Sequence, residues 1–272
     1  MKAGLAMDAG AISRTFRSWN EGLLSSYLLD ITCDILNKRD DDGNRILDYI
    51  LDTAGQNHTS RWAALTALKL ETPLPLITEA VHAGYRSRSK DLREEAAAEL
   101  PAVSPRLNGD RQPMLESLRQ ALLASSLVAW AEGLSLLKAA NMEWGWEIPL
   151  STVARLWQGG STIRSALLEP VAGTLREVPN LPSLMLAPSF RQQFSDSQQE
   201  WRRIVARAAE QGIPVPAMSA ALAHYDMFRS RQLPANLIQA QRDYFGAHTY
   251  ERTDQHRGTY FHTDWKEPAS ST

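Results

Sequence analysis

Apolar residues recur along most of the chain at the three- and four-residue spacing of a helix with one buried face. The clearest case is the segment 118–137, where Leu118, Leu122, Ala129 and Leu136 are separated mainly by other apolar or small residues. No proline interrupts this segment, so the pattern predicts one long, largely buried helix. Shorter helices are predicted at 23–36, 59–70, 76–85, 163–175, 201–210 and 217–228. Alternating, strand-like runs are scarce, so the sequence predicts an all-α fold.

The chain also repeats itself. Trp19 and Trp157 each begin a Trp-x-x-Gly sequence that is followed by a Leu-Leu pair. Trp62 and Trp201 each open a predicted helix that ends near a Pro-x-Pro sequence. Because these features return in the same order at an offset of about 138 residues, the sequence predicts an internal duplication.

The duplication predicts the domain organisation. We expect one helical domain over 1–248, with repeats at about 1–117 and 118–248, and a C-terminal tail over 249–272. The long helix at 118–137 precedes the second Trp-x-x-Gly sequence, and its counterpart would lie ahead of residue 1. The first repeat is therefore expected to lack its opening helix. The alternative is that this repeat never had one.

Charge and cysteine usage narrow the class of protein. Lys and Arg number 29 against 31 Asp and Glu, so the near balance gives no reason to expect a nucleic-acid or membrane-surface partner. Cys33 is the single cysteine, which excludes an intrachain disulfide and a zinc site built on several thiolates. The N-terminal residues lack the apolar core of a signal peptide, and we expect no membrane span. These features favour the cytoplasm.

Common catalytic and cofactor motifs are absent from the sequence. It contains no Gly-x-Gly-x-x-Gly, no phosphate-binding P-loop, no His-Glu-x-x-His and no Gly-x-Ser-x-Gly. One candidate site lies near the C-terminus, where a helix predicted to start at Pro234 ends at Gly246 between Arg242 and His248. Arginine with histidine at a chain reversal can bind a phosphate or carboxylate group. A helix cap from His248 and a surface ion pair from Arg242 are the structural alternative.

Several motifs resemble a known family. QAQRDYFGAHTYER at 239–252 and FHTDW at 261–265 are similar to the C-terminal signature of 6-phosphogluconate dehydrogenase. SWNEG at 18–22, EWGW at 143–146 and the sequence from Trp157 to Ser165 resemble the same family, as does the AGQ–T–RW stretch at 54–62. The resemblance extends over essentially the whole chain.

The resemblance implies an activity and also what this chain lacks. The family oxidises 6-phosphogluconate with NADP in the pentose phosphate pathway, and decarboxylates the 3-keto intermediate to ribulose 5-phosphate and CO2. Its NADP lies in an N-terminal Rossmann domain. Its general-base lysine and general-acid glutamate lie in or just before the helix that opens the first repeat. By resemblance, the present chain contains none of these, so we expect it to be inactive alone.

The resemblance also assigns substrate-binding residues. Arg242 and His248 match the pair that the family's tail inserts into the partner subunit's site, and Thr59 matches a threonine that contacts the substrate phosphate. Asn57 and Gly84 stand where the family has a lysine and an arginine, so weaker phosphate binding is expected. A homodimer, or a complex with a separate Rossmann chain, is the expected assembly. The alternatives are a non-catalytic helical dimerisation module and a truncated or split-gene fragment.

Overall fold

The structure is a computed structural model that describes residues 1–55, 58–103, 105–106 and 109–266. The chain divides into two compact units, Met1–Tyr225 and Asp226–Thr272. Over the described ranges the predicted all-α fold is confirmed. The α-helices are α1 Lys2–Leu5, α2 Ala9–Trp19, α3 Tyr27–Asn37, α4 His58–Lys69, α5 Pro75–Arg88, α6 Lys90–Glu99, α7 Arg111–Trp144, α8 Leu150–Gln158, α9 Leu168–Glu177, α10 Pro188–Glu210, α11 Pro216–Arg229 and α12 Ala235–Gly246. Two 3-10 helices lie at Ile46–Tyr49 and Leu184–Leu186.

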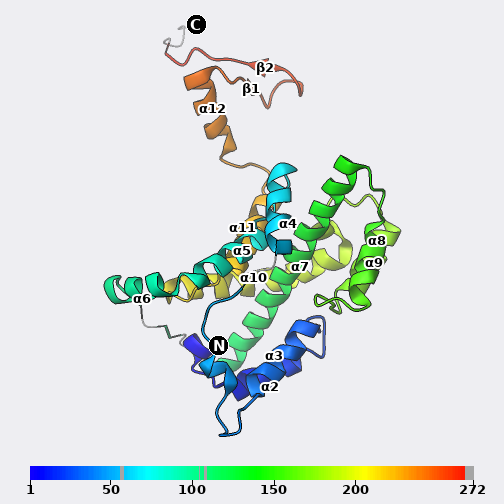
Figure 1. The fold of residues 1–272 in the computed structure, drawn as a ribbon. Coiled ribbons are helices and arrows are strands. Elements are labelled where there is room, and N and C mark those ends of the chain that lie inside the picture. The colour runs from blue at the N-terminus through cyan, green and yellow to red at the C-terminus, as the bar shows by residue number, and fades with distance from the viewer. Residues whose placement is uncertain (56–57, 104, 107–108, 267–272) are drawn as a thin grey trace. The chain divides into compact units, whose positions relative to one another are not determined.

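Helix α7 forms the centre of the first unit and packs against α10 (Figure 1). Its side chains at Ala121, Leu127, Val128 and Ala131 are almost completely buried. It has the length and apolar composition of a membrane-crossing helix, which the sequence analysis did not expect, yet 56% of its most apolar window is buried inside the protein. Burial against other helices identifies α7 as the core helix of a packed domain.

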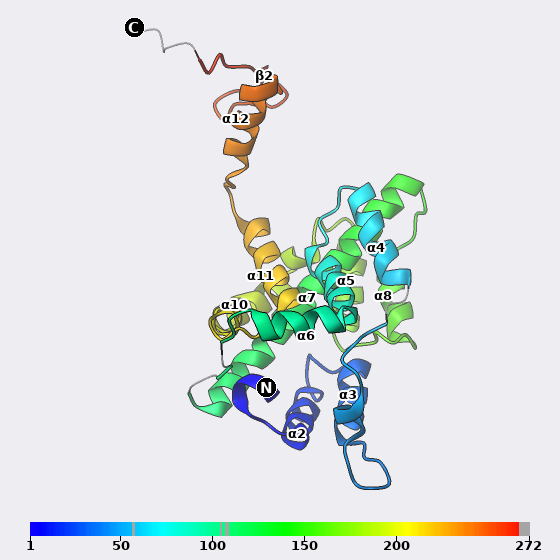
Figure 2. The ribbon, with the colours of Figure 1, turned by 60° about the vertical axis from the view of Figure 1, so that its left-hand side comes forward.

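Helix pairs surround α7. Figures 1 and 2 show α2 beside α3, and α8 packs against α9 in the same way. Side-chain caps begin two of these helices: Asp8 accepts a hydrogen bond from the Ala11 amide at 2.8 Å, and Ser26 accepts one from the Leu29 amide at 3.3 Å. Helices α5 and α11 each begin with a proline at the first helical position, where a missing N–H costs little.

The predicted helix at 201–210 is longer in the structure, where α10 begins at Pro188. Its first half is rich in polar residues, which obscured the pattern, but Phe190, Phe194, Ser197 and Trp201 recur at helical spacing and are all buried. The second unit contains α12 and a short antiparallel hairpin of β1 Tyr250–Glu251 and β2 Tyr260–Phe261. This hairpin is the one sheet in the described residues and was not predicted.

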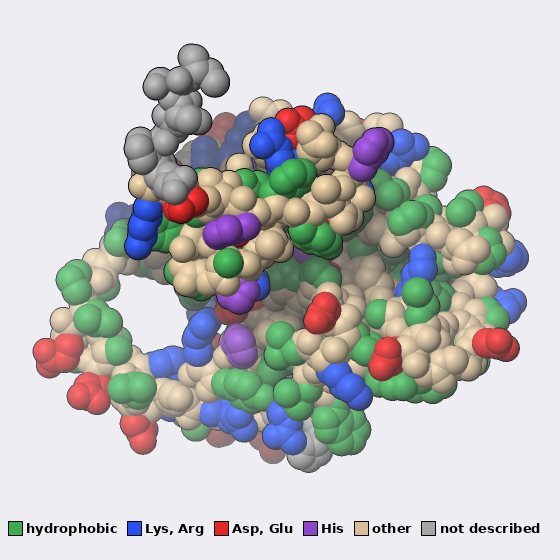
Figure 3. All heavy atoms as spheres, turned by 90° about the horizontal axis from the view of Figure 1, so that it is seen from above, with side chains coloured by type: hydrophobic (Ala, Val, Ile, Leu, Met, Phe, Trp, Pro, Cys, Tyr) green, Lys and Arg blue, Asp and Glu red, His purple; other side chains and the backbone are tan. Residues whose placement is uncertain are grey.

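Large apolar side chains also remain at the surface. Leu65 and Leu68 on α4 are 57% and 76% exposed, and Phe245 on α12 is 71% exposed. The space-filling view shows hydrophobic side chains lying between charged ones on the visible face (Figure 3). Exposed apolar groups of this size are common at surfaces that contact another chain.

Candidate functional site

The C-terminal candidate residues lie on the unit formed by α12 and the tail. Arg242 is in the last turn and a half of α12, and His248 follows the helix end after Ala247. Both side chains are exposed. Within the described ranges, neither the Arg242 guanidinium nor the His248 ring makes a hydrogen bond or ion pair. The proposed ion pair of Arg242 and cap by His248 are therefore not observed, and both groups are available to a ligand.

Asp243 anchors the tail to α12. Its side chain is fully buried and accepts three hydrogen bonds, from the Thr263 amide at 3.1 Å, Trp265 Nε1 at 2.8 Å and His262 Nδ1 at 2.9 Å. Burial alone would raise the pKa of this carboxyl, but the three hydrogen bonds outweigh it and lower the pKa. Asp243 is therefore an ionised hub that holds the FHTDW segment against the helix.

Gln239 fixes the chain reversal at His248. Its side-chain amide donates to the carbonyl oxygens of His248 at 2.9 Å and Thr249 at 2.6 Å. Ala247 and Thr249, on either side of His248, both have the left-handed backbone that non-glycine residues rarely adopt, with φ of 48° and 34°. Such strained residues persist where surrounding contacts impose them, and they are common at functional sites.

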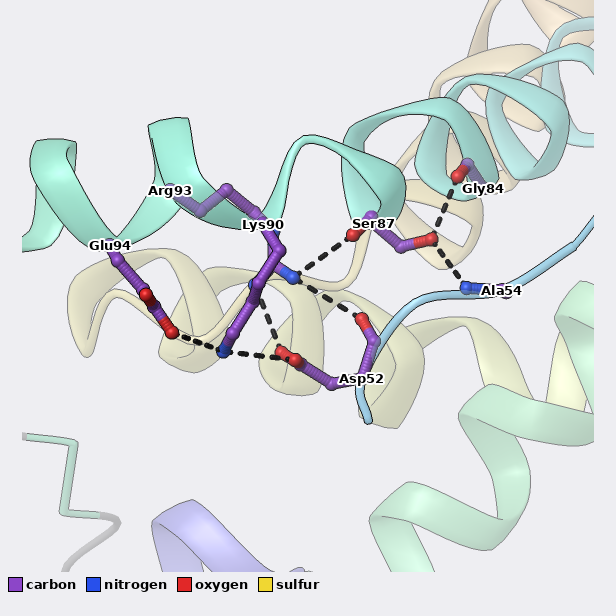
Figure 4. Close-up of polar contacts among 7 residues, drawn as sticks. All are labelled: Asp52, Ala54, Gly84, Ser87, Lys90, Arg93 and Glu94. Carbon is purple, nitrogen blue, oxygen red and sulfur yellow. Dashed lines mark hydrogen bonds and ion pairs between the residues drawn. The ribbon is translucent and has the colours of Figure 1, made fainter. Parts of the chain in front are cut away.

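Thr59 and Gly84 belong to the first unit. Thr59 is exposed in the first turn of α4, and Gly84 lies half-buried in α5. Asn57 lies outside the described residues. The structure brings the segment before Thr59 together with the helix that contains Gly84, as Figure 4 shows. Ser87 Oγ accepts a hydrogen bond from the Ala54 amide at 2.9 Å and donates one to the Gly84 carbonyl at 2.7 Å.

Asp52 provides a second anchor for the same segment. Its carboxylate forms ion pairs with Lys90 and Arg93 of α6, each at 3.0 Å (Figure 4). The hydrogen bond from Arg93, followed by that from Lys90, lowers the pKa of Asp52 to about 2. Arg93 also donates to the Ser87 carbonyl at 3.0 Å. The chain that leads to Thr59 is thus tied to the junction of α5 and α6.

Helix α5 is itself positioned by α7. Glu132 of α7 is 1% exposed, and its two carboxylate oxygens accept hydrogen bonds from the Leu76 and Ile77 amides at 3.0 and 3.1 Å. Burial raises the pKa of Glu132 to about 7, although the two backbone hydrogen bonds oppose the shift. The sequence analysis missed this residue, because one acidic residue in an apolar helix gives no indication of a partner 55 positions away.

Two arginines of α5 near Gly84 already have partners. Arg86 forms an ion pair with Glu79 at 2.8 Å, and the Arg88 guanidinium lies over the Tyr85 ring at 5.1 Å. Thr59 therefore offers a hydroxyl, while Arg86 and Arg88 are both held by side chains of α5. Over the described ranges, no cluster of three or more His, Cys, Asp or Glu side chains is arranged to hold a metal ion.

Comparison with known proteins gives one consistent result. The family description "6-phosphogluconate dehydrogenase, C-terminal domain" matches residues 1–265, which include Thr59, Gly84, Arg242, His248 and the FHTDW segment. Two curated relatives, both named "6-phosphogluconate dehydrogenase, decarboxylating", are from Escherichia coli strain K12 and Synechocystis sp. strain PCC 6803. The first is 45% identical over 265 residues, covering 97% of this chain and 56% of the relative. The second is 42% identical over 267 residues, with coverage of 97% and 55%.

A solved structure agrees. The chain matches Plasmodium falciparum 6-phosphogluconate dehydrogenase with a TM-score of 0.92 and 38% identity, covering 97% of this chain and 57% of that one. That protein is described in its apo form, in complex with its cofactor NADP+ and in complex with its substrate 6-phosphogluconate. The present chain spans about half the length of the relatives it matches.

Proposed function

Because the chain belongs to the family of 6-phosphogluconate dehydrogenase C-terminal domains, we propose that it is the helical, substrate-binding part of an enzyme that converts 6-phosphogluconate to ribulose 5-phosphate and CO2. The observation that carries the proposal is that the polar groups of Arg242 and His248 are exposed and unpaired in the described residues. Both side chains are exposed and have no polar partner in the described residues, although the neighbouring Asp243 is saturated with hydrogen bonds. A cation and a hydrogen-bond donor held free on an ordered chain reversal suit a phosphate group.

The oxidation itself requires groups that this chain does not supply. The sequence has no dinucleotide-binding glycine motif, and its described strands form only a two-stranded hairpin, so the residues present do not fit NADP. The family resemblance also implies that the general base and general acid belong to the part of the enzyme that precedes the matched region. We therefore propose that the chain is inactive alone and functions in the cytoplasm with an N-terminal, NADP-binding half.

The substrate site is proposed to form between two copies of the chain. In this arrangement Arg242 and His248 of one copy meet Thr59 of the other. The anchored segment at Asp52–Gly55 supports this role, since its hydrogen bonds order the approach to Thr59. With Asn57 and Gly84 replacing two cations, Arg242 carries the larger share of phosphate affinity.

The internal duplication remains part of the proposal, and one contact supports it. Ser26 and Ser165, which are 139 positions apart, form an antiparallel bridge in which the Tyr27 amide donates to the Arg164 carbonyl and the Ala166 amide to the Ser25 carbonyl. Antiparallel pairing of equivalent residues is what a local two-fold axis produces. Ala6 and Gly145, also 139 apart, both end helices in the left-handed conformation. This supports α1 as the counterpart of the last turn of α7.

The test is reconstitution. The full chain is mixed with the N-terminal part of the E. coli relative that precedes the matched region, and NADPH formation from NADP+ and 6-phosphogluconate is followed. We expect activity from the mixture and none from either part alone. Arg242→Ala should abolish detectable 6-phosphogluconate binding by the mixture, whereas Arg88→Ala should change it little. If Arg242→Ala binds substrate as well as the parent, a non-catalytic dimerisation module becomes the better assignment.

A further inference from the structure

The end of α12 has its glycine in an unexpected place. A helix usually ends with glycine in the left-handed position, because a side chain there crowds its own backbone. In α12 the left-handed residue is Ala247, with φ of 48°. The glycine precedes it, at Gly246, which is the last helical residue and does not have positive φ. Helix formation alone would favour the opposite order.

The ring of His248 explains the glycine. A Cβ atom at position 246 would lie 2.8 Å from His248 Nε2 and 2.9 Å from His248 Cδ2, which is closer than such atoms can approach. The imidazole therefore lies directly on the helix surface that a side chain at 246 would occupy. Its location depends on the missing side chain and not on the backbone conformation of Gly246.

The same geometry brings His248 to the face of Arg242. Residues four apart in a helix lie on one face, so Arg242 is one turn before Gly246 on the face against which the imidazole lies at Gly246. The left-handed backbone at Ala247 and Thr249 and the two hydrogen bonds from Gln239 turn the chain back over this face. The Phe245 and His248 rings lie nearly perpendicular to each other, with their centroids 6.0 Å apart.

We propose that Gly246 is a positioning residue: its missing side chain lets His248 fold back beside Arg242, so that both groups bind one phosphate of a sugar phosphate. The proposal rests on the proposed function, because it concerns how that site is held. It also explains why strain is accepted at Ala247. Helix stability and ligand binding favour opposite residues at 246, so they should respond to substitution in opposite directions.

The decisive variant is the exchange Gly246→Ala with Ala247→Gly. It provides a better helix former at 246 and a residue that tolerates positive φ at 247, so the midpoint of thermal unfolding should rise. In the reconstituted mixture the same variant should bind 6-phosphogluconate about tenfold more weakly, since one hydrogen bond to a charged group is lost. A residue with a purely structural role would not give a more stable protein with a weaker site.

Gly173→Ala is the matched control. Gly173 is a helical glycine of α9, and a Cβ added there meets no atom within 4 Å. This variant should raise the unfolding midpoint and leave 6-phosphogluconate binding unchanged. If the 246/247 exchange binds as tightly as the parent, the positioning role is overturned while the proposed function stands.

A spectroscopic measurement keeps the inference separate from the proposed function. In the full chain, an NMR Overhauser contact between the His248 ring protons and the α-protons of residue 246 is expected in the parent and should disappear in Gly246→Ala. A contact that persists in the variant overturns the proposal, even if substrate binding has changed. If the parent mixture binds no 6-phosphogluconate, the proposed function fails, and with it the ligand-binding part of this inference.

Discussion

The carboxylate of Glu132 accepts a hydrogen bond from the Ile77 amide at 3.1 Å. In this way Glu132 of α7 caps the first turn of α5. Its second oxygen accepts the Leu76 amide. An N-cap on the same chain segment normally supplies such acceptors, but Leu74 has no side chain that can do so. The core helix α7 therefore both packs against α5 and completes its hydrogen bonding.

This cap predicts a dependence of stability on pH. Burial raises the pKa of Glu132 to about 7, so the folded state resists the ionisation that the unfolded state undergoes near its ordinary value. The carboxyl group therefore lowers the free energy of unfolding as pH rises from about 4.5 through 7, by on the order of 3 kcal/mol. In Glu132→Gln this loss should be absent. Urea unfolding at pH 5 and pH 8 should show that the variant gains stability relative to the parent at the higher pH; parallel profiles would contradict the prediction.

The three hydrogen bonds to Asp243 predict which substitution detaches the FHTDW segment from α12. Asn at this position offers one acceptor oxygen in place of two and cannot satisfy Thr263, Trp265 and His262 together. In Asp243→Asn, the Thr263 amide should exchange with solvent about tenfold faster or more, as measured by hydrogen exchange. Asp254→Asn, which removes an exposed ion pair to Arg252, is the control and should leave the Thr263 amide protected.

Acid should release the same contact. The pKa of Asp243 is lowered in the folded state, so its contribution is present above the ordinary pKa of an aspartate and is lost as pH falls through the lowered value. Protection of the Thr263 amide should therefore persist at neutral pH and disappear only in strong acid. Loss of protection already near neutral pH would contradict the prediction, because the Asp243 carboxylate is ionised there.

The hydrogen bonds of Ser87 are expected to hold the segment before Thr59 in place. In Ser87→Ala the Ala54 amide loses its acceptor and the Gly84 carbonyl loses a donor. The free energy needed to open the segment 52–55 locally should therefore fall by about 1–2 kcal/mol. Hydrogen exchange at the Ala54 amide reports this directly. Ser89→Ala is the control, since the Ser89 hydroxyl makes no capping bond to α6. Equal exchange in the two variants would assign the order of the segment to Asp52 alone.

The sequence predicted the helices better than the contacts that position the site. The helix over 118–137 was predicted because its periodicity is local, and Arg242 and His248 were proposed as binding residues because their motif is contiguous. Asp243 was missed although it lies in that motif, because its three donors follow 19–22 positions later. Gly246 is ordinary in sequence, and its role depends on where the His248 ring lies. Partners distant in sequence leave no periodic signal, so such roles require the fold.

Self-association is the remaining prediction, and the α12 surface allows it to be tested. Leu237, Ala240, Tyr244 and Trp265 line a hollow of about 430 Å³ on the second unit, and Leu237 is 63% exposed there. An apolar hollow of this kind suits an apolar side chain of a second chain, and the family resemblance predicts a dimer in which the tail contacts its partner. We expect light scattering to show a dimer of the full chain at micromolar concentration.

Leu237→Glu would place a charge in the hollow and should weaken the dimer about tenfold or more. Gln255→Glu introduces the same charge on the exposed hairpin loop and should leave the dimer intact. A parent chain that stays monomeric would contradict dimerisation itself, and equal association of the two variants would place the dimer contact elsewhere on the chain.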